Sequence, residues 1–372
     1  MSELDALETP AAIVDLDRLS RNLDRAATYA TVHGLALRPH VKTHKASWIA
    51  AEQIRRGAAG VTCATPREAE VMSGVSNDLL VAYPPVGKAR AARIAALPRD
   101  IKVTVALDSL EAVETIERAA SAARRSVGVY VELDLGMHRV GVPTVEAAIG
   151  LAKRVTASRS LTYEGIAFYP GHIREPVSAQ ENSIGQLRAQ LGVVLDALTA
   201  AGVKPRVVSG GSTPTMWQTH EIMGVTELRP GTYVFNDRTT AEIGACSWDD
   251  CALTVLATVV STAVAGQAVI DAGSKSLGRE PMRGADGGGG FGSLLDHPEV
   301  IVKSMSEEHG LLDLAHSSWA PRVGDVVRVI PNHVCIVVHL NDSIYGIRGE
   351  EVEVSWPVEA RGRGPALTPT AE

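Results

Sequence analysis

The 372-residue sequence is poor in aromatic side chains, in cysteine and in long apolar runs. Aromatic residues make up only 4% of the chain although apolar residues reach 45%, a composition typical of closely packed helices and parallel strands. The four cysteines are irregularly spaced, so they do not indicate a disulfide framework and they favour a reducing compartment. No stretch approaches the roughly 18 apolar residues that would indicate a membrane span.

Other absences narrow the class of partner. The formal net charge is -7 and no basic stripe is concentrated anywhere, which argues against nucleic-acid binding and favours a small-molecule partner. The segment from Met1 to Pro10 carries acids and lacks the basic and apolar regions of a signal peptide. We therefore expect a cytoplasmic protein without a membrane partner.

From position 36 onward, short apolar runs alternate with Ala-, Arg- and Glu-rich segments of helical period. Residues 66–70 open one such helix, with a proline at an early position and acids in the first turn. Eight parallel strands with intervening helices, spanning roughly 200 to 250 residues, predict a (β/α)8 barrel of the triosephosphate isomerase (TIM) type. The expected strands cover residues 36–42, 60–65, 79–84, 102–108, 127–134, 163–170, 205–210 and 226–235.

After about position 235 the texture changes to Val- and Ile-rich segments without long helical runs, which predicts a C-terminal antiparallel β domain. These segments are 252–262, 268–272, 326–330 and 334–340, and the segment 11–16 is a candidate extra strand of the same domain. Since the chain exceeds the size of a single core, we expect a barrel at 17–240 and a β domain made of 1–16 and 241–372. The glycine-rich stretch 284–292 and the tail 361–372 are expected to be flexible loops.

Lys42 stands where the first strand is expected to end. Active sites of such barrels lie at the carboxyl ends of the strands, so an amine there can act as a nucleophile across the barrel mouth. The alternative is an ordinary surface lysine in the basic run 42–45. Other polar residues at expected strand ends are Asp134, Tyr169, His172, Ser209 and Ser212.

Two glycine-containing turns face this amine in the expected topology. Residues 209–214 follow the seventh strand and 229–233 lie on the eighth, the positions at which this fold often holds a phosphate group. An amine opposite a phosphate grip indicates pyridoxal 5'-phosphate. Arg139 could place a positive charge near that cofactor, or it could pair structurally with Asp134 or Glu132.

His333 and Cys335 form a second candidate site. On a strand, residues two apart project from the same face, so the imidazole and the sulfur would converge. This donor pair favours zinc or a similar divalent metal and leaves coordination positions open for substrate or water. An isolated His-x-Cys pair is, however, more often without a metal.

Taken in order, these motifs resemble the fold-type III pyridoxal phosphate enzymes related to alanine racemase, in the branch of D-threonine aldolase and eukaryotic-type D-serine dehydratase. The resemblance implies that Lys42 rather than Lys45 binds the cofactor covalently. It also implies that His333 and Cys335 hold a divalent metal; some members carry aspartate in place of Cys335 and prefer manganese, so zinc, manganese and magnesium stay open. The cofactor contacts expected from it are Thr65, Arg139, Tyr169, Ser212, Thr213, Gly231, Thr232 and Tyr233, with Thr65 near a position where many members have glutamine. The motifs that carry the resemblance lie at 8–11, 38–42, 134–139, 169–172, 209–213, 229–233, 271–275, 308–310 and 331–335.

The activity that the resemblance implies is metal-assisted retro-aldol cleavage of D-3-hydroxy amino acids, with His172 as the base, giving glycine and acetaldehyde from D-threonine. The rival is a D-serine dehydratase that gives pyruvate and ammonia, or a related 3-hydroxy-D-aspartate aldolase or dehydratase. A racemase has no use for a metal, and a non-catalytic cofactor carrier resembles a lone barrel, so both are weighed below these. The resemblance also implies a homodimer, and it leaves open whether His333 and Cys335 serve their own Lys42 or the partner's.

Overall fold

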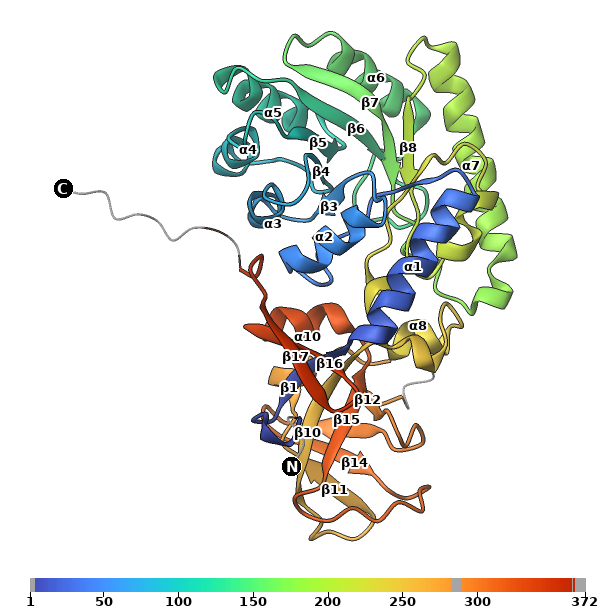
Figure 1. Ribbon diagram of the computed structural model, residues 1–372. Coiled ribbons are helices and arrows are strands. Elements are labelled where there is room, and N and C mark those ends of the chain that lie inside the picture. Colours follow the sequence, from blue (N-terminus) through green and yellow to red (C-terminus); the bar gives the residue numbers. More distant parts are fainter. Residues whose placement is uncertain (1–3, 283–288, 363, 365–372) are drawn as a thin grey trace, which may run out of the picture.

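The computed structural model describes residues 4–282, 289–362 and 364. Figure 1 shows two sheets one above the other, with the barrel in the upper half and a second sheet in the lower half. Residues 284–288 of the glycine-rich stretch, and residues 363 and 365–372 of the tail, lie outside the described residues.

The upper sheet contains the eight expected strands, and all neighbouring strands in it are parallel. Their order is β2-β9-β8-β7-β6-β5-β4-β3, and a bridge between His40 and Thr62 brings β3 back beside the segment that follows β2. The TIM-like barrel is thus confirmed. The strands are β2 (Ala36–Leu37), β3 (Val61–Cys63), β4 (Asp78–Val81), β5 (Lys102–Leu107), β6 (Val127–Leu133), β7 (Leu161–Phe168), β8 (Val207–Gly210) and β9 (Glu227–Leu228).

The first and last barrel strands are much shorter than the sequence predicted. Pro39 closely follows β2 and Pro230 closely follows β9. Proline has no N–H for the ladder, so pairing stops near it. The run 229–233 was therefore wrongly placed on a strand, because it forms a loop and the 3-10 turn η4 (Thr232–Val234).

Helices cover the outer face of the barrel and bury aliphatic side chains against it. Ile94, Ile116 and Val155 belong to one core with the strand residues Val105 and Val129. The predicted helix start at residue 66 is confirmed, since Pro66 occupies the first turn of its helix. The helices are α1 (Leu16–Val32), α2 (Ser47–Arg55), α3 (Pro66–Met72), α4 (Lys88–Ala95), α5 (Leu110–Ala122), α6 (Val145–Thr156) and α7 (Glu181–Ala200).

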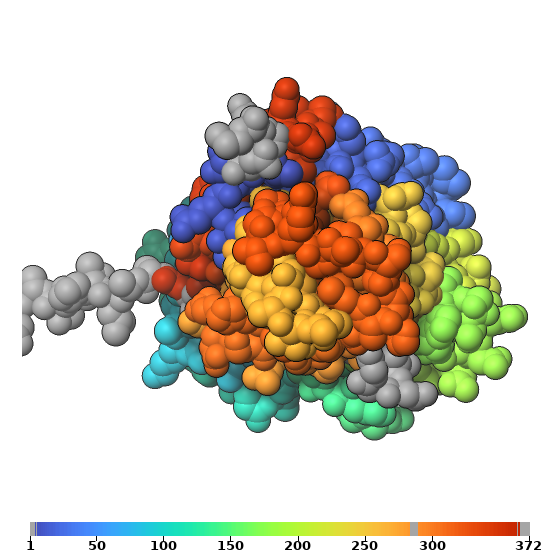
Figure 2. Space-filling model, turned by 90° about the horizontal axis from the view of Figure 1, so that it is seen from below, coloured from blue at the N-terminus to red at the C-terminus, as the bar shows by residue number. Residues whose placement is uncertain are grey.

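The lower sheet is antiparallel except where β1 runs parallel to β16. The segment from Ala11 to Asp15 forms β1 and lies between β10 and β16. Seen from below, the N-terminal residues (blue) lie beside the C-terminal ones (red) (Figure 2). The other strands are β10 (Leu253–Ser261), β11 (Gln267–Ile270), β12 (Gly292–Leu294), β13 (Val302–Met305), β14 (Gly310–Asp313), β15 (Val326–Pro331), β16 (Ser343–Arg348) and β17 (Glu351–Pro357).

One predicted strand is wrong, because residues 334–340 form the helix α10 (Val334–Leu340). Its buried residues are Val334, Val337 and Val338, and this spacing of three and four places them on one helical face. The β-branched composition favoured a strand, but burial of one helical face overrides that preference. Two further short helices, α8 (Arg238–Glu242) and α9 (Ser274–Leu277), lie in the same half of the chain.

A second core joins the two sheets. It contains Leu37 of β2 and Ile49 of α2 together with Val334 and Val337 of α10. The helix α10 is therefore packed between the lower sheet and the barrel, as Figure 1 also shows. Among the described helices, none has the length and apolar character needed to cross a bilayer.

Candidate active site

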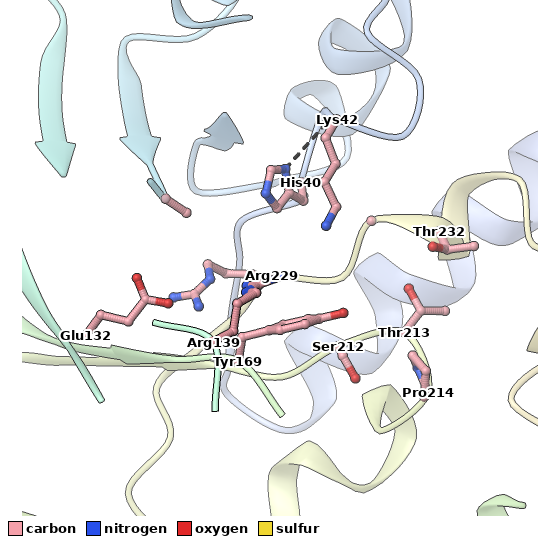
Figure 3. Close-up of a pocket in the computed structure, with 12 residues that line it drawn as sticks. His40, Lys42, Glu132, Arg139, Tyr169, Ser212, Thr213, Pro214, Arg229 and Thr232 are labelled. Carbon is pink, nitrogen blue, oxygen red and sulfur yellow. Dashed lines mark hydrogen bonds between the residues drawn. The ribbon is translucent and has the colours of Figure 1, made fainter. Parts of the chain in front are cut away.

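A cavity opens at the carboxyl ends of the barrel strands (Figure 3). Lys42 enters it from the segment after β2, Tyr169 directly after β7, and Arg229 directly after β9. These loops converge because the carboxyl ends of parallel barrel strands open on one side. The cavity brings together seven of the expected site residues, and its lining consists of His40, Lys42, Ala82, Glu132, Arg139, Tyr169, Ser212, Thr213, Pro214, Arg229, Gly231 and Thr232.

The structure distinguishes Lys42 from Lys45. The Lys45 amine forms an ion pair with the carboxylate of Glu68, which is fully buried and also accepts a hydrogen bond from the Ala64 N–H at 2.5 Å. Within the described residues the Lys42 amine has no ion-pair or hydrogen-bond partner, and it lies 5.7 Å from the centroid of the Tyr169 ring. Of the two lysines, only Lys42 presents a free amine to the cavity.

Arg139 lies over the same aromatic ring, with its guanidinium carbon 5.0 Å from the Tyr169 centroid. The structural alternative, a pairing with Asp134 or Glu132, does not form among the described residues. The Asp134 carboxylate instead accepts hydrogen bonds from the N–H groups of Gly136 at 3.0 Å and His138 at 2.9 Å. The Arg139 charge therefore faces the cavity, where a cation over an aromatic face is favourable.

Arg229 is a buried cation of the cavity that sequence reasoning did not assign. Its guanidinium donates hydrogen bonds to the Ser209 hydroxyl at 2.7 Å and to the Phe168 carbonyl at 2.9 Å. The Ser209 hydroxyl in turn donates to the Glu227 carboxylate at 2.5 Å. Burial lowers the pKa of Arg229 from its ordinary value, and the carboxylates of Glu132 and Glu227 oppose that shift. A positive charge is thus fixed in the cavity by contacts on several sides.

The loop after β8 and the turn η4 form a cradle of hydrogen-bond donors. The Thr213 hydroxyl oxygen accepts a hydrogen bond from the Tyr233 N–H at 3.1 Å, which ties the two segments together. In the described part of the chain, no group accepts a hydrogen bond from the N–H of Thr213, Gly231 or Thr232. These N–H groups and the hydroxyls of Ser212 and Thr213 suit an anion such as phosphate.

A second cavity adjoins the first, because Tyr169, Pro214 and Thr232 line both. It extends the barrel mouth towards the C-terminal half of the chain and contains His333. Its full lining is Tyr169, Gly171, Arg174, Pro214, Thr232, Asp237, Thr239, Thr240, Ile243, Glu280, Pro281, Asn332 and His333.

His333 and Cys335 do come together, although not on a strand. His333 directly precedes α10 and Cys335 lies in its first turn, close enough for the charges of the two side chains to interact. Burial disfavours the imidazolium, but the Cys335 thiolate and the Asp237 carboxylate outweigh it and raise the pKa of His333 to about 11. Burial likewise opposes the thiolate, yet His333 lowers the pKa of Cys335 below its ordinary value. A ready thiolate beside an imidazole fits a divalent metal such as zinc.

The His333–Cys335 pair touches the segment that carries Lys42. The Cys335 sulfur lies 3.2 Å from the hydroxyl oxygen of Thr43, which follows Lys42 directly. Among the residues that the structure describes, no group of three or more His, Cys, Asp or Glu side chains could hold a metal ion. A metal on these two donors would therefore take its other ligands from water or substrate.

Four expected site residues line neither cavity, namely Cys335, Thr65, Tyr233 and His172. The Thr65 hydroxyl caps α3, accepting a hydrogen bond from an N–H of its first turn at 3.2 Å. The Tyr233 side chain is buried, and its hydroxyl oxygen accepts a hydrogen bond from the Gln53 amide at 2.9 Å. His172 is exposed in the loop after β7 and packs on Gly136, where an added Cβ would lie 2.9 Å from its Nε2.

Sequence reasoning assigned no role to three residues that structure the two cavities. Arg229 and Thr43 stand at or beside strand ends, so the rule that singled out Lys42 and Tyr169 would also have found them. Asp237 gives no comparable signal, because an aspartate before a helix reads as an ordinary cap.

Comparison with known proteins defines the class. The chain belongs to the family described as "Alanine racemase, N-terminal domain", whose sequence model matches residues 14–239. A second model, of a serine dehydratase domain, matches residues 252–347. These matches confirm both the expected family and the expected fold. The family is dependent on pyridoxal phosphate.

Similar proteins place the chain more closely. A 3-hydroxy-D-aspartate aldolase of Paracoccus denitrificans (strain Pd 1222) is 32% identical over 371 residues, covering 96% of this chain and 93% of that protein. A D-threo-3-hydroxyaspartate dehydratase of Delftia sp. (strain HT23) is 34% identical over 348 residues, covering 88% and 91%. The crystal structure of D-threonine aldolase from Filomicrobium marinum superposes with a TM-score of 0.88 at 31% identity, covering 96% of each chain. These relatives are aldolases and dehydratases, which supports lyase chemistry without separating the two reactions.

Proposed function

We propose that this chain is a metal-dependent D-threonine aldolase that uses pyridoxal phosphate. It cleaves the bond between the α and β carbons of D-3-hydroxy amino acids and converts D-threonine to glycine and acetaldehyde. The observation that carries the proposal is the shared mouth: Lys42 and His333 line adjoining cavities, and Cys335 contacts Thr43, the residue next to Lys42.

The residues around the first cavity suit the cofactor. Lys42 would attach its aldehyde, Ser212, Thr213, Gly231 and Thr232 would hold its phosphate, and Arg139, Tyr169 and Arg229 would surround its ring, as proposed from the lining. The sequence-based contacts Thr65 and Tyr233 stay in the proposal as neighbours outside that lining. When bound, pyridoxal phosphate takes up the electrons released at the α carbon.

The residues at the second cavity would act on the substrate hydroxyl. A divalent ion held by His333 and Cys335 would supply Lewis acidity there. A D-threo-3-hydroxyaspartate dehydratase solved as a cysteine-to-alanine variant in a metal-free form supports a metal in that relative. Zinc, manganese and magnesium are the candidates, and the donor pair favours zinc.

His172 is proposed as the base that removes the hydroxyl proton. Partial desolvation by neighbouring groups lowers its pKa, while Glu175 and Asp134 oppose that shift. The imidazole is therefore neutral at pH 7 and can accept a proton at a ring nitrogen. Its loop also carries Tyr169, which lines both cavities, so His172 lies in the chain segment that borders the proposed substrate site.

The second candidate is dehydration, and the 34% identity to the Delftia dehydratase favours it. The same residues would serve: Lys42 would remove the α proton and the metal site would assist loss of the hydroxyl, so that D-serine gives pyruvate and ammonia. The two reactions differ in the bond that is broken, and therefore in their products.

Product analysis separates the two candidates. The purified protein is incubated with D-threonine, D-serine and D-threo-3-hydroxyaspartate, with and without added divalent metal. Glycine with an aldehyde supports the aldolase, whereas a 2-oxo acid with ammonia supports the dehydratase. Neither product from any of the three substrates would refute both. The proposal includes the homodimer that the resemblance implies, which sedimentation of the same sample tests.

A further inference from the structure

Two buried side chains contact the metal-binding pair from outside it. We infer that Asp237 and Thr43 are positioning residues of this site: Asp237 orients His333 so that it binds the ion through Nε2, and Thr43 fixes the sulfur of Cys335. The inference rests on the proposed function, because it concerns the metal site assigned there.

Asp237 is held rigidly at the beginning of α8, with a side chain that is only 1% exposed. One carboxylate oxygen accepts hydrogen bonds from the N–H and the hydroxyl of Thr240, both at 2.9 Å. The other oxygen accepts a hydrogen bond from the Val334 N–H at 3.3 Å and lies 3.3 Å from Nδ1 of His333. The carboxylate thereby joins the beginnings of α8 and α10 and faces the imidazole.

The ring nitrogen that a metal would use follows from this contact. A metal replaces one ring proton, and because a carboxylate only accepts hydrogen bonds, the proton that stays is the one on Nδ1, donated to Asp237. The metal then binds through the lone pair of Nε2. Metal-bound histidines generally donate their other ring N–H to such a partner, which fixes the ring orientation.

Thr43 plays the corresponding part for Cys335. The threonine is fully buried, and its hydroxyl oxygen lies 3.2 Å from the sulfur. An added Cβ at Gly231 would lie 2.8 Å from that hydroxyl, so the backbone of another loop packs against Thr43 closely. When the sulfur is a thiolate it only accepts, and the hydroxyl becomes the donor. A valine of the same shape would remove this donor from the thiolate.

The alternative is that both residues serve only the fold, Asp237 as a helix cap and Thr43 as a space-filling side chain. Asp237→Ser retains a good cap but cannot reach His333. Thr43→Val retains the volume but lacks the hydroxyl. Both variants therefore keep the structural role and remove the proposed one, and the conservative changes Asp237→Asn and Thr43→Ser restore a polar contact.

The test is a titration of Zn²⁺ into the full-length holoenzyme against a chromophoric chelator. Asp237→Ser and Thr43→Val are each expected to weaken zinc binding by about 10- to 100-fold. The zinc affinity of Thr43→Ser should stay within about threefold of that of the unaltered protein. The zinc affinity of Asp237→Asn should lie between those of the unaltered protein and Asp237→Ser. Thr62→Val is the matched control, because Thr62 is a fully buried barrel residue whose hydroxyl donates to the Arg38 carbonyl at 3.0 Å. The zinc affinity of this variant should equal that of the unaltered protein.

A second readout addresses the ring nitrogen directly. Long-range ¹H–¹⁵N spectra of the zinc-loaded protein, labelled at histidine, should show His333 with a protonated Nδ1 and a metal-bound Nε2. The His333 signals are identified by their loss in His333→Gln. Metal on Nδ1 overturns the role of Asp237.

The outcomes separate this inference from the proposed function. If His333→Gln abolishes zinc binding while Asp237→Ser and Thr43→Val stay within about threefold of the unaltered protein, the metal site stands and the positioning roles are overturned. If His333→Gln binds zinc as tightly as the unaltered protein, the metal site itself is wrong.

Discussion

The two lysines of the segment after β2 allow a test in which stability and cofactor binding respond to different substitutions. Lys45→Met removes the cation of a buried ion pair whose side chains are 11% and 0% exposed. Glu68 would keep a buried charge with the Ala64 N–H, at 2.5 Å, as its remaining partner. Removing one member of such a pair costs about 3–5 kcal/mol. Lys42→Ala breaks no ion pair or hydrogen bond of its amine, so we expect a change of about 0.5 kcal/mol or less.

Cofactor binding should respond in the opposite way. Lys42→Ala is expected to abolish turnover and the visible absorbance of the bound cofactor, whereas Lys45→Met should retain both in the fraction that is folded. Stability is compared by urea denaturation of the cofactor-free proteins, because a bound ligand would stabilise only the variants that retain it. The double variant Lys45→Met/Glu68→Gln should recover most of the loss, since the amide oxygen still accepts from the Ala64 N–H without an unpaired charge.

Two results would refute this reasoning. If Lys45→Met unfolds at the same urea concentration as the unaltered protein, the buried pair contributes nothing. If Lys45→Met loses the visible absorbance while Lys42→Ala keeps it, the roles of the two lysines are the reverse of those proposed.

Three further outcomes are expected. Gly231→Ala should weaken cofactor binding by roughly 10-fold or more, because an added Cβ would lie 2.8 Å from the Thr43 hydroxyl. The control Gly185→Ala in α7 has open space around its Cβ, so it should leave cofactor binding unchanged and raise stability by about 0.5–1 kcal/mol. If both variants bind the cofactor equally well, the crowding at Gly231 is contradicted. Burial lowers the pKa of His44 to about 4 from 6.5, so the unfolded chain binds more protons between these values and stability should fall by on the order of 3 kcal/mol as the pH drops through that window. Urea denaturation of the cofactor-free protein at pH 7 and pH 4 checks this, and His44→Gln should lose that part of the slope. Dialysis against a chelator should abolish turnover without removing the visible absorbance of the cofactor, and readdition of zinc, manganese or magnesium identifies the metal; undiminished turnover would favour a racemase.

The barrel could be predicted from the sequence because its signals are local. Each strand is a short apolar run followed by polar residues, and the helix start at Pro66 depends on neighbouring positions alone. Tyr169 directly follows β7 as predicted, whereas Lys42 lies in a turn beyond the end of β2 and still lines the cavity. The prediction made β2 and β9 too long, because it did not include the effect of Pro39 and Pro230, which cannot donate to strand pairing.

The arrangement of His333 and Cys335 could not be predicted in the same way. A run of β-branched residues carries a strand preference, and only the core of the folded chain makes α10 a helix. The contacts of Thr43 with Cys335 and of Asp237 with His333 join residues that are 292 and 96 positions apart. No periodicity reports such pairs, so the sequence singled out His333 and Cys335 by their residue type but gave no sign of their contacts with Asp237 and Thr43.

The position of α10 bears on a question that the sequence left open, namely whether His333 and Cys335 would serve the Lys42 of their own chain or that of a partner. Val334 and Val337 flank Cys335 and share a core with Leu37, which lies on the strand leading to Lys42. Sliding Cys335 away from Thr43 would expose these fully buried side chains, and each would cost about 1.5–3 kcal/mol. Packing within one chain therefore fixes the sulfur beside its own Lys42 segment. A partner subunit could complete the mouth from outside, but it is not needed to bring the sulfur to that segment.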